Sequence, residues 1–237
     1  METLKNKTVL LTGATSGVGK ELLFQLLEQG ANVAFCGRSA EKMEEVSQEL
    51  KGFDSSRFYS ETFCLSDEKR IIGFVKASHS HFGPIDILIN NAGLNNTRAE
   101  VTQLQTADLD WMMTINCKAP AAFMREVGTI MVQQKQGLVV NILSSVCLFT
   151  NEGNGGYTAS KAAIDALTKV FRKEVRKHNI RVLSVYPGGI DTPFRTKERP
   201  DYLSPKQVAD VIINALTTDS FIAMDELVFR PMVETNF

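Results

Sequence analysis

The sequence has little of what marks membrane-spanning or nucleic-acid-binding proteins. No uninterrupted apolar run reaches the ~18 residues that a membrane-spanning helix needs. The 26 Lys and Arg residues nearly balance the 27 Asp and Glu residues, and the formal net charge is −1. A chain so balanced has no overall basic footprint that would hold nucleic acid or an anionic membrane. We therefore expect neither kind of partner.

Cysteine is also scarce, and its spacing matches neither a metal site nor a redox motif. The four cysteines are scattered along the chain: Cys36, Cys64, Cys117 and Cys147. His79 and His81 lie two apart, on different faces of a predicted helix, so they do not form a metal site together. Residues 1–7 are polar and run straight into an apolar segment, unlike a signal peptide. These features predict reduced thiols, no metal and a cytoplasmic protein.

Repeats, low-complexity segments and Pro/Gly-rich linkers are absent as well. A length of 237 residues suits one α/β domain with a large core. We therefore expect a single domain that spans residues 1–237.

Short apolar segments alternate with amphipathic ones along the whole chain. Strands are predicted over residues 8–12, 32–36, 57–63, 86–90, 138–143, 180–186 and 226–229. Helices are predicted over 20–29, from 39 to about 50, from 66 onward, over 108–134, from 157 onward, and after residues 204–207, which have the pattern of a capping box. This alternation predicts a parallel sheet of about seven strands with helices on both faces, and ligands at the carboxyl ends of the strands.

A glycine-rich turn, Gly13-Ala-Thr15-Ser16-Gly17-Val18-Gly19, joins the first predicted strand to the first helix. Backbone N–H groups in such a turn can approach a pyrophosphate at the positive end of the helix. The spacing is not the G-x-G-x-x-G of the commoner dinucleotide-binding turn. A P-loop is excluded because Glu21, rather than Ser or Thr, follows Lys20. Taken alone, the turn could equally be structural.

Tyr157 and Lys161 lie four residues apart at the start of a long helical pattern, so their side chains stack on one helix face. A phenol ionises near pH ~10, and a lysine ammonium held close to it lowers its pKa. The pair could thus make tyrosine a general acid and base at neutral pH. Apolar residues give this helix a predicted core-facing stripe: Ile164, Leu167, Phe171 and Val175. Taken alone, the two residues could equally be a surface pair.

Several short motifs occur in the order found in one enzyme family. They are Thr12-Gly13-x-x-x-Gly17-x-Gly19, Asn90-Asn91-Ala92-Gly93, Asn116, Ser144, Tyr157-x-x-x-Lys161 and Pro187-Gly188-x-Ile190-x-Thr192. With them, the chain resembles the short-chain dehydrogenase/reductase (SDR) family over essentially its whole length. The resemblance implies a Rossmann-like, doubly wound α/β fold that binds an extended nicotinamide dinucleotide.

The resemblance also implies catalytic roles for four residues. Tyr157 would protonate the substrate carbonyl as hydride arrives, and Lys161 would lower the pKa of Tyr157 and hold the nicotinamide ribose. Ser144 would hydrogen-bond the carbonyl, and Asn116 would position a helix backbone and a water for a proton relay. Ser145 is adjacent, but counting along the chain from both neighbouring motifs places the family's serine at Ser144.

The implied cofactor is NADP(H) rather than NAD(H). NAD-preferring relatives carry an acidic residue at the end of the second strand, where this chain has Gly37 followed by Arg38 and Ser39. An arginine can bind a 2′-phosphate that a carboxylate would repel. The implied cofactor-binding residues are Gly13, Thr15, Ser16, Gly17, Val18, Gly19, Arg38, Ser39, Leu65, Asn91, Ala92, Gly93, Tyr157, Lys161, Pro187, Gly188, Ile190 and Thr192. One departure is Cys64, which stands where the family usually has an aspartate that contacts adenine.

Two segments are expected to line the substrate pocket. They are residues 146–156, between the serine strand and the Tyr157 helix, and residues 189–203, which we expect to act as a mobile lid. The C-terminal residues 226–231 faintly resemble the tail of the branch that oxidises small 3-hydroxy acids, including serine-like ones.

The predicted activity is the interconversion of a secondary alcohol and a ketone or aldehyde, on a small-molecule substrate, by hydride transfer with NADP(H). Two alternatives stay open: a 3-oxoacyl thioester reductase, and a catalytically idle NADP-binding sensor or scaffold. The intact set of Ser144, Tyr157 and Lys161 argues against the sensor, because binding alone needs no activated phenol. The resemblance further implies a homo-dimer or homo-tetramer, packed through residues 108–134 and the Tyr157 helix.

Overall fold

The computed structural model describes residues 3–192 and 199–235 of the chain. Within these residues, seven strands form a parallel sheet in the order β3-β2-β1-β4-β5-β6-β7. The strands are β1 (Thr8–Thr12), β2 (Asn32–Gly37), β3 (Phe58–Thr62), β4 (Ile87–Asn90), β5 (Gly137–Ile142), β6 (Ile180–Pro187) and β7 (Glu226–Phe229). The predicted parallel sheet of about seven strands is confirmed, and each strand lies within two residues of its predicted bounds.

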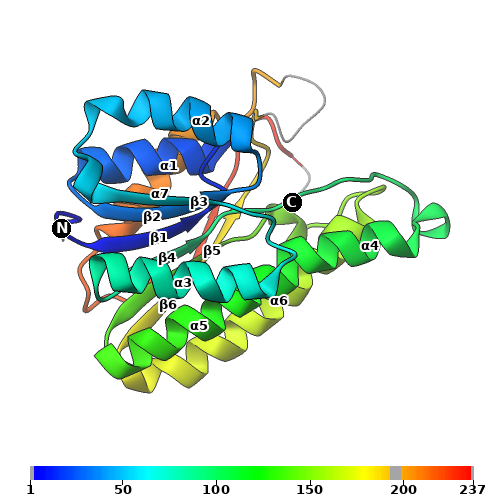
Figure 1. The fold of residues 1–237 in the computed structure, drawn as a ribbon. Helices are drawn as coiled ribbons and strands as arrows, with labels where there is room; N and C mark the ends of the chain where they lie inside the picture. Colours follow the sequence, from blue (N-terminus) through cyan, green and yellow to red (C-terminus); the bar gives the residue numbers. More distant parts are fainter. Residues whose placement is uncertain (1–2, 193–198, 236–237) are drawn as a thin grey trace.

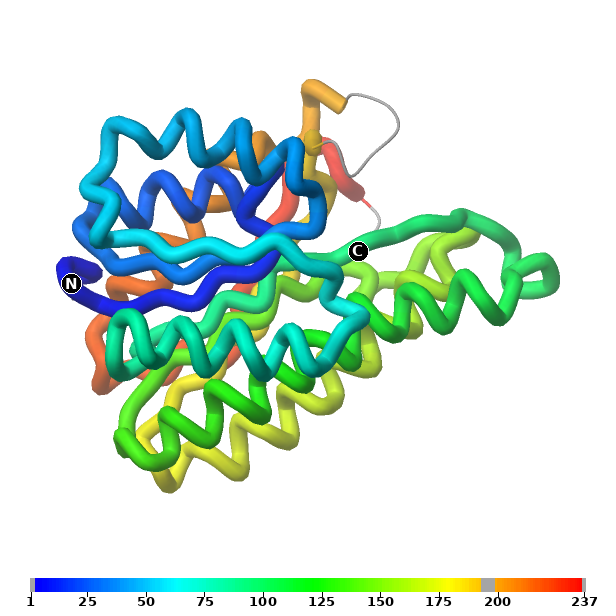
Figure 2. The backbone as a smooth tube through the Cα atoms, in the orientation of Figure 1, coloured from blue at the N-terminus to red at the C-terminus, as the bar shows by residue number. Residues whose placement is uncertain are grey.

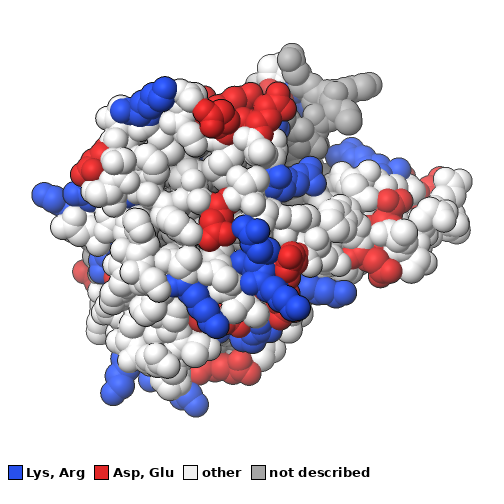
Figure 3. Space-filling model, viewed as in Figure 1, with Lys and Arg blue, Asp and Glu red and all other residues white. Residues whose placement is uncertain are grey.

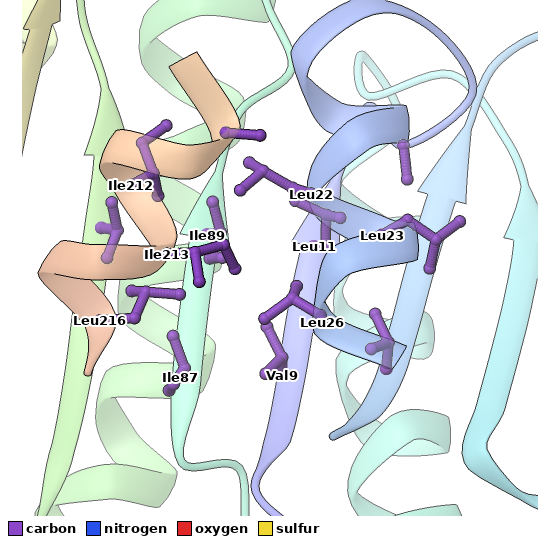
Figure 4. Close-up of a cluster of buried hydrophobic side chains, with 14 of the residues drawn as sticks. Val9, Leu11, Leu22, Leu23, Leu26, Ile87, Ile89, Ile212, Ile213 and Leu216 are labelled. Carbon is purple, nitrogen blue, oxygen red and sulfur yellow. The ribbon is translucent and has the colours of Figure 1, made fainter. Parts of the chain in front are cut away.

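Helices cover both faces of the sheet (Figure 1). One face carries α1 (Gly17–Glu28), α2 (Ala40–Glu49) and α7 (Pro205–Leu216), and the other carries α3 (Glu68–Phe82), α5 (Ala119–Gln134) and α6 (Gly155–Val175). Successive strand residues point to opposite faces, so Val9 and Leu11 pack in one core and Leu10 in the other. Figure 4 shows Leu11 beside Leu22 and Val9 beside Leu26, both of α1. Because both faces are covered, the central strands are mostly apolar, which is why they are recognisable from the sequence.

The order of the strands determines where a ligand can bind. Strands β2 and β3 follow one another on one side of β1, and β4 lies on the other side of β1. Loops that leave the carboxyl ends of β1 and β4 therefore diverge, and a crevice opens between them. The glycine turn follows β1, and the Asn91–Ala92–Gly93 turn follows β4.

Two predicted helices differ in detail. The first begins at Gly17 rather than Lys20, directly after the glycine turn. The region predicted over 108–134 consists of α4 (Thr106–Met113), a turn of π-helix over Thr114–Lys118, and α5. Extra residues in a π-helical turn redirect side chains, and such turns are frequent at functional sites. Asn116 lies in the middle of this one.

The predicted core-facing stripe of the Tyr157 helix is wrong at Leu167. This side chain is 46 % exposed, and Val170 beside it is 55 % exposed. Helix α6 packs on the sheet through Ile164 and the buried Thr168 instead, which leaves Leu167 about a quarter-turn too far round the helix to reach the core. The predicted capping box is confirmed, since Ser204 Oγ accepts from the Gln207 N–H at 3.2 Å and the reciprocal bond is 2.8 Å.

An arm projects from the sheet on the side of the carboxyl ends (Figure 2). It contains α4 and the chain before it, and the loop after β5 runs alongside, where Ala99 N–H donates to the Gly153 carbonyl at 3.1 Å. Acidic and basic side chains are interspersed over the face that Figure 3 shows. In residues 3–192 and 199–235, no helix has the length and apolar content to span a membrane.

Candidate active site

A cleft of about 1060 Å³ opens at the carboxyl ends of the strands. Every residue predicted to bind cofactor or to act in catalysis lines this cleft, apart from Asn116. The glycine turn, the Asn91–Ala92–Gly93 turn and residues 187–192 are far apart in sequence. They come together here because β1, β4, β5 and β6 are neighbours in the sheet.

The glycine turn packs so closely against the turn after β4 that side chains at two of its positions would collide. Gly13 has a φ of 70°, and a Cβ there would lie 2.8 Å from the Cα of Ala92. A Cβ at Gly19 would lie inside 3.0 Å of both the Gly13 carbonyl oxygen and the Asn91 amide nitrogen. Bare backbone therefore lines this end of the cleft, where α1 begins, and the N–H groups of a first helical turn can bind an anion.

Asn91 holds the glycine turn in place. Its side-chain amide donates to the carbonyl oxygens of Thr12, at 3.0 Å, and Gly13, at 3.1 Å. The hydroxyl of Thr12 in return accepts from the backbone N–H groups of Asn91 and Ala92, each at 3.1 Å. The predicted cofactor residue Asn91 thus uses its side chain to brace the turn.

The end of β2 has the features of a site for a phosphate. A Cβ at Gly37 would lie 2.5 Å from a methyl carbon of Thr15, so an acidic residue fits there only if the Thr15 side chain shifts. Arg38 and Ser39 line the cleft beside it, and so does Lys42, which the sequence analysis missed. Among the described residues, the side chains of Arg38 and Lys42 have no hydrogen-bond or ion-pair partner. Their spacing of four residues, across the start of α2, is the signal that could have revealed Lys42.

Two cysteines stand on the same side of the cleft. Burial raises the pKa of Cys36 to about 12, so its thiol stays protonated at neutral pH. Cys64, at the position of the family's aspartate, is half-buried and lines the cleft together with Leu65. Its sulfur accepts from the Ser66 hydroxyl at 3.2 Å. Within the part of the chain that the structure describes, no group of three or more His, Cys, Asp or Glu residues could hold a metal ion.

Lys161 is the buried cation of the cleft, with 5 % of its surface exposed. Its ammonium donates to the carbonyl oxygen of Ile142, the last residue of β5, at 2.8 Å. Burial lowers the pKa of Lys161 to about 8 from an ordinary 10.5, because the charged form loses its hydration. The side chain can therefore gain and lose a proton near neutral pH, as a proton relay requires.

Asn116 lies behind the cleft wall, next to Lys161. A Cβ placed on Gly93 would lie 3.3 Å from both the Asn116 Oδ1 and the Lys161 Nζ atoms. Asn116 clamps the backbone of Leu94, accepting from its N–H at 2.8 Å and donating to its carbonyl oxygen at 2.7 Å. It also donates to the Ser160 hydroxyl at 2.9 Å, which in turn donates to the carbonyl oxygen of Tyr157. Asn116 thus joins the chain after β4 to the first turn of α6.

Ser144 and Tyr157 face the cleft from two different elements. Ser144 follows β5 in an extended conformation, and its hydroxyl accepts from the Val146 N–H at 3.3 Å. Tyr157 lies in the first turn of α6 and is half-buried. Both line the cleft together with Lys161, and Ser145 lines it too. A hydroxyl donor, a phenol and a buried ammonium in one cleft can bind a carbonyl oxygen and deliver a proton to it.

The other half of the cleft contains residues that the motifs did not predict. They are Leu94, Asn95, Asn96, Arg98, Trp111, Ile115, Val233, Glu234 and Thr235. Tyr202 lines the same half and belongs to the predicted segment 189–203. The predicted segment 146–156 contributes Val146, Asn151, Glu152 and Asn154, and residues 193–198 of the predicted lid lie outside the described residues. No local pattern indicates that the tail enters the cleft, because its position depends on contacts with the turn after β6.

Comparisons with known proteins agree with this geometry. The family model described as short chain dehydrogenase matches residues 7–203. An uncharacterized oxidoreductase of Staphylococcus epidermidis is 30 % identical over 237 residues, with 98 % of this chain and 100 % of the relative covered. Serine dehydrogenase from Escherichia coli superimposes with a TM-score of 0.86 at 25 % identity, over 96 % of this chain and 99 % of that one. A metagenomic short-chain oxidoreductase in complex with NADP gives 0.84 at 27 % identity, over 98 % and 99 %. The chain belongs to the short-chain dehydrogenase family and is one of its oxidoreductases.

Proposed function

We propose that the protein is an NADP(H)-dependent oxidoreductase that interconverts a secondary alcohol and a ketone or aldehyde. The observation that carries the proposal is the buried ammonium of Lys161, in the same cleft as Ser144 and Tyr157 and beside Asn116. A buried cation costs free energy, so its presence calls for a role. A bound nicotinamide would supply or accept the hydride.

Each catalytic group has a distinct task in the proposal. The Ser144 hydroxyl donates a hydrogen bond to the substrate oxygen and orients it. Tyr157 donates its proton to that oxygen in reduction and removes a proton from the alcohol in oxidation. The positive charge of Lys161 stabilises the phenolate that Tyr157 becomes. Asn116 joins the chain after β4 to the helix that carries both residues.

The residues of the cleft fit a dinucleotide with a 2′-phosphate. The bare glycine turn and the N-terminus of α1 would hold the pyrophosphate, and Arg38, Ser39 and Lys42 the 2′-phosphate. The contact between Gly37 and the Thr15 side chain disfavours the carboxylate that NAD-preferring relatives use, because Thr15 would have to shift to admit it. The NADP complex of the metagenomic relative supports binding of NADP(H).

Small 3-hydroxy acids and the matching 3-keto acids are the first substrates to test. The structural likeness to serine dehydrogenase supports this class, in line with the resemblance of residues 226–231. Ketones and 3-oxoacyl thioesters complete the panel, because a thioester reductase remains the rival enzyme.

The decisive experiment is a titration of the purified protein with NADPH and with NADH. Trp111 is the only tryptophan of the chain and lines the cleft, so its fluorescence reports binding directly. We expect NADPH to bind at least about tenfold more tightly than NADH, since a charge-assisted contact to the phosphate contributes about 1.5–3 kcal/mol. The double variant Arg38→Ala/Lys42→Ala should lose this preference, whereas Lys51→Ala, away from the cleft, should keep it. Tighter binding of NADH would contradict the cofactor assignment.

Turnover of the panel then separates an enzyme from a sensor. Tyr157→Phe should bind NADPH like the original protein and lose turnover by a factor of about 10²–10⁴, the usual contribution of a general acid. A protein that binds NADPH tightly but turns over no member of the panel would favour the sensor.

The proposal includes a cytoplasmic homo-dimer or homo-tetramer. A hollow of about 620 Å³ lies between α5 and α6, lined by apolar groups that include Met124, Val132 and Phe171. Leu167 and Val170 are large apolar residues of this face that are exposed. Apolar side chains at such positions are typical of a helix pair that packs on a second copy.

A further inference from the structure

The C-terminal segment, residues 230–235, returns to the cleft after β7. Val233, Glu234 and Thr235 line the cleft, at the half where the substrate is expected. Figure 2 shows the red end of the chain beside the orange segment that precedes α7. The segment comes from the edge of the sheet, yet it contacts both loops that border the substrate pocket.

Its first contact is with the turn after β6. The β6–β7 hydrogen bonds end with the Gly188 N–H, which donates to the Phe229 carbonyl oxygen at 2.8 Å. The next N–H, that of Gly189, lies beyond β7 and donates to the Glu234 carboxylate at 2.8 Å. A backbone bond between Glu234 N–H and the Pro231 carbonyl oxygen, at 3.0 Å, folds the tail into a turn that brings the carboxylate back. Glu234 thus provides the hydrogen-bond acceptor for the Gly189 N–H, which β7 is too short to provide.

The two glycines leave space for this contact. A Cβ at Gly188 or at Gly189 would lie inside 3.0 Å of a Glu234 carboxylate oxygen. Gly189 is also covered by the ring of Tyr202, which would meet such a Cβ as well. The carboxylate therefore sits directly on the backbone of the turn, and a side chain at either position would push it off.

The second contact is with the loop that follows Ser144. The guanidinium of Arg230 lies over the ring of Phe149, 4.6 Å from its centroid. Phe149 is tied to the start of the same loop by its N–H, which donates to the Ser145 carbonyl oxygen at 2.9 Å. One short segment is thus attached to both loops, at Phe149 on one side of the pocket and at Gly189 on the other.

We propose that Glu234 is a positioning residue for the substrate, acting through its hydrogen bond to Gly189. This inference rests on the proposed function, because it assigns a role within the same cleft. The bond holds the C-terminal segment against the turn after β6. It therefore holds Val233 and Thr235 in place as part of the wall of the substrate pocket. A wall that binds substrate and transition state alike affects KM rather than kcat.

Two substitutions distinguish the effect of the Glu234 hydrogen bond from the effect of its charge. Glu234→Gln keeps an oxygen that can accept from the Gly189 N–H but removes the charge, whereas Glu234→Ala removes both. Glu45→Ala, an exposed glutamate on α2 outside the cleft, is the matched control for loss of a negative charge.

The test measures the kinetics with the best substrate of the panel, together with hydrogen exchange of the Gly189 amide in peptides that cover residues 187–192. We expect Glu234→Ala to raise KM about fivefold to tenfold, with kcat and the NADPH dissociation constant within about twofold, and to speed up exchange about tenfold. Glu234→Gln and Glu45→Ala should stay close to the original protein in both readouts.

Three results would overturn the proposal. Unchanged KM and exchange in Glu234→Ala would show that the bond does not hold the turn. A Glu234→Gln variant as impaired as Glu234→Ala would show that the charge acts instead. If the original protein turns over no carbonyl in the panel, the proposed function fails and the assignment of Glu234 fails with it. If the original protein turns over a substrate normally and Glu234→Ala has the same KM and exchange rate, only the assignment of Glu234 is refuted.

Discussion

Replacing Lys161 by methionine should stabilise the protein while it abolishes turnover. Burial lowers the pKa of Lys161 from 10.5 to about 8, and at about 1.4 kcal/mol per pKa unit this corresponds to a cost of about 3 kcal/mol at pH 7. Methionine fills a similar length without a charge but loses the bond to the Ile142 carbonyl oxygen, which contributes about 1 kcal/mol. We therefore expect a net gain of about 2 kcal/mol, or a Tm higher by about 4 to 8 °C.

The pH dependence of this gain has a defined sign. Between pH 8 and 10.5, Lys161 binds a proton in the unfolded chain but is largely deprotonated in the folded one. Stability rises with pH wherever the unfolded state binds more protons, so the original protein gains stability over this range from Lys161 and Lys161→Met does not. The difference in Tm should therefore shrink between pH 7 and pH 9.5.

The assay is thermal unfolding of both proteins without cofactor, by calorimetry or circular dichroism, at several pH values. Lys169→Met on the same helix is the matched control. Lys169 hydrogen-bonds Asp165 at 2.8 Å, and this bond raises the pKa of Lys169, so its removal should lower the Tm. A Lys161→Met variant that melts at or below the original protein at pH 7 would refute the reasoning. So would a gap in Tm that is the same at both pH values.

Three further substitutions test other parts of the molecule. Gly19→Ala places a Cβ against the Gly13 carbonyl oxygen and should weaken NADPH binding at least about tenfold, by fluorescence titration, whereas Gly73→Ala in open space on α3 should bind normally. Asn116→Ala removes three hydrogen bonds, two of them to Leu94, and should lower both kcat and Tm, the latter by about 4 °C or more; an unchanged Tm would contradict the clamp. Leu167→Glu should convert the proposed oligomer to monomers in sedimentation, and an unaltered sedimentation coefficient would exclude the α5–α6 face as the interface.

The sequence alone determined the seven strands, the positions of most helices and the glycine turn. These features are encoded locally. A strand buried on both faces appears in the sequence as a short apolar run. The capping box of α7 is complete within four residues, and the three glycines of the glycine turn lie within seven residues. Leu167 was misplaced because a helical stripe shows which side chains are apolar but not which of them the sheet covers.

Only the tertiary structure decided how the groups of the cleft support one another. Asn116 reaches Leu94 across 22 residues, and Glu234 reaches Gly189 across 45. The low pKa of Lys161 comes from burial, which depends on every element packed around it. Gly37 lies against the side chain of Thr15, which belongs to the glycine turn after β1. This contact disfavours an acidic residue at the end of β2 and so bears on the choice between NADP(H) and NAD(H). Contacts of this range leave no periodic signal, since they depend on where the sheet places the chain and not on neighbouring residues.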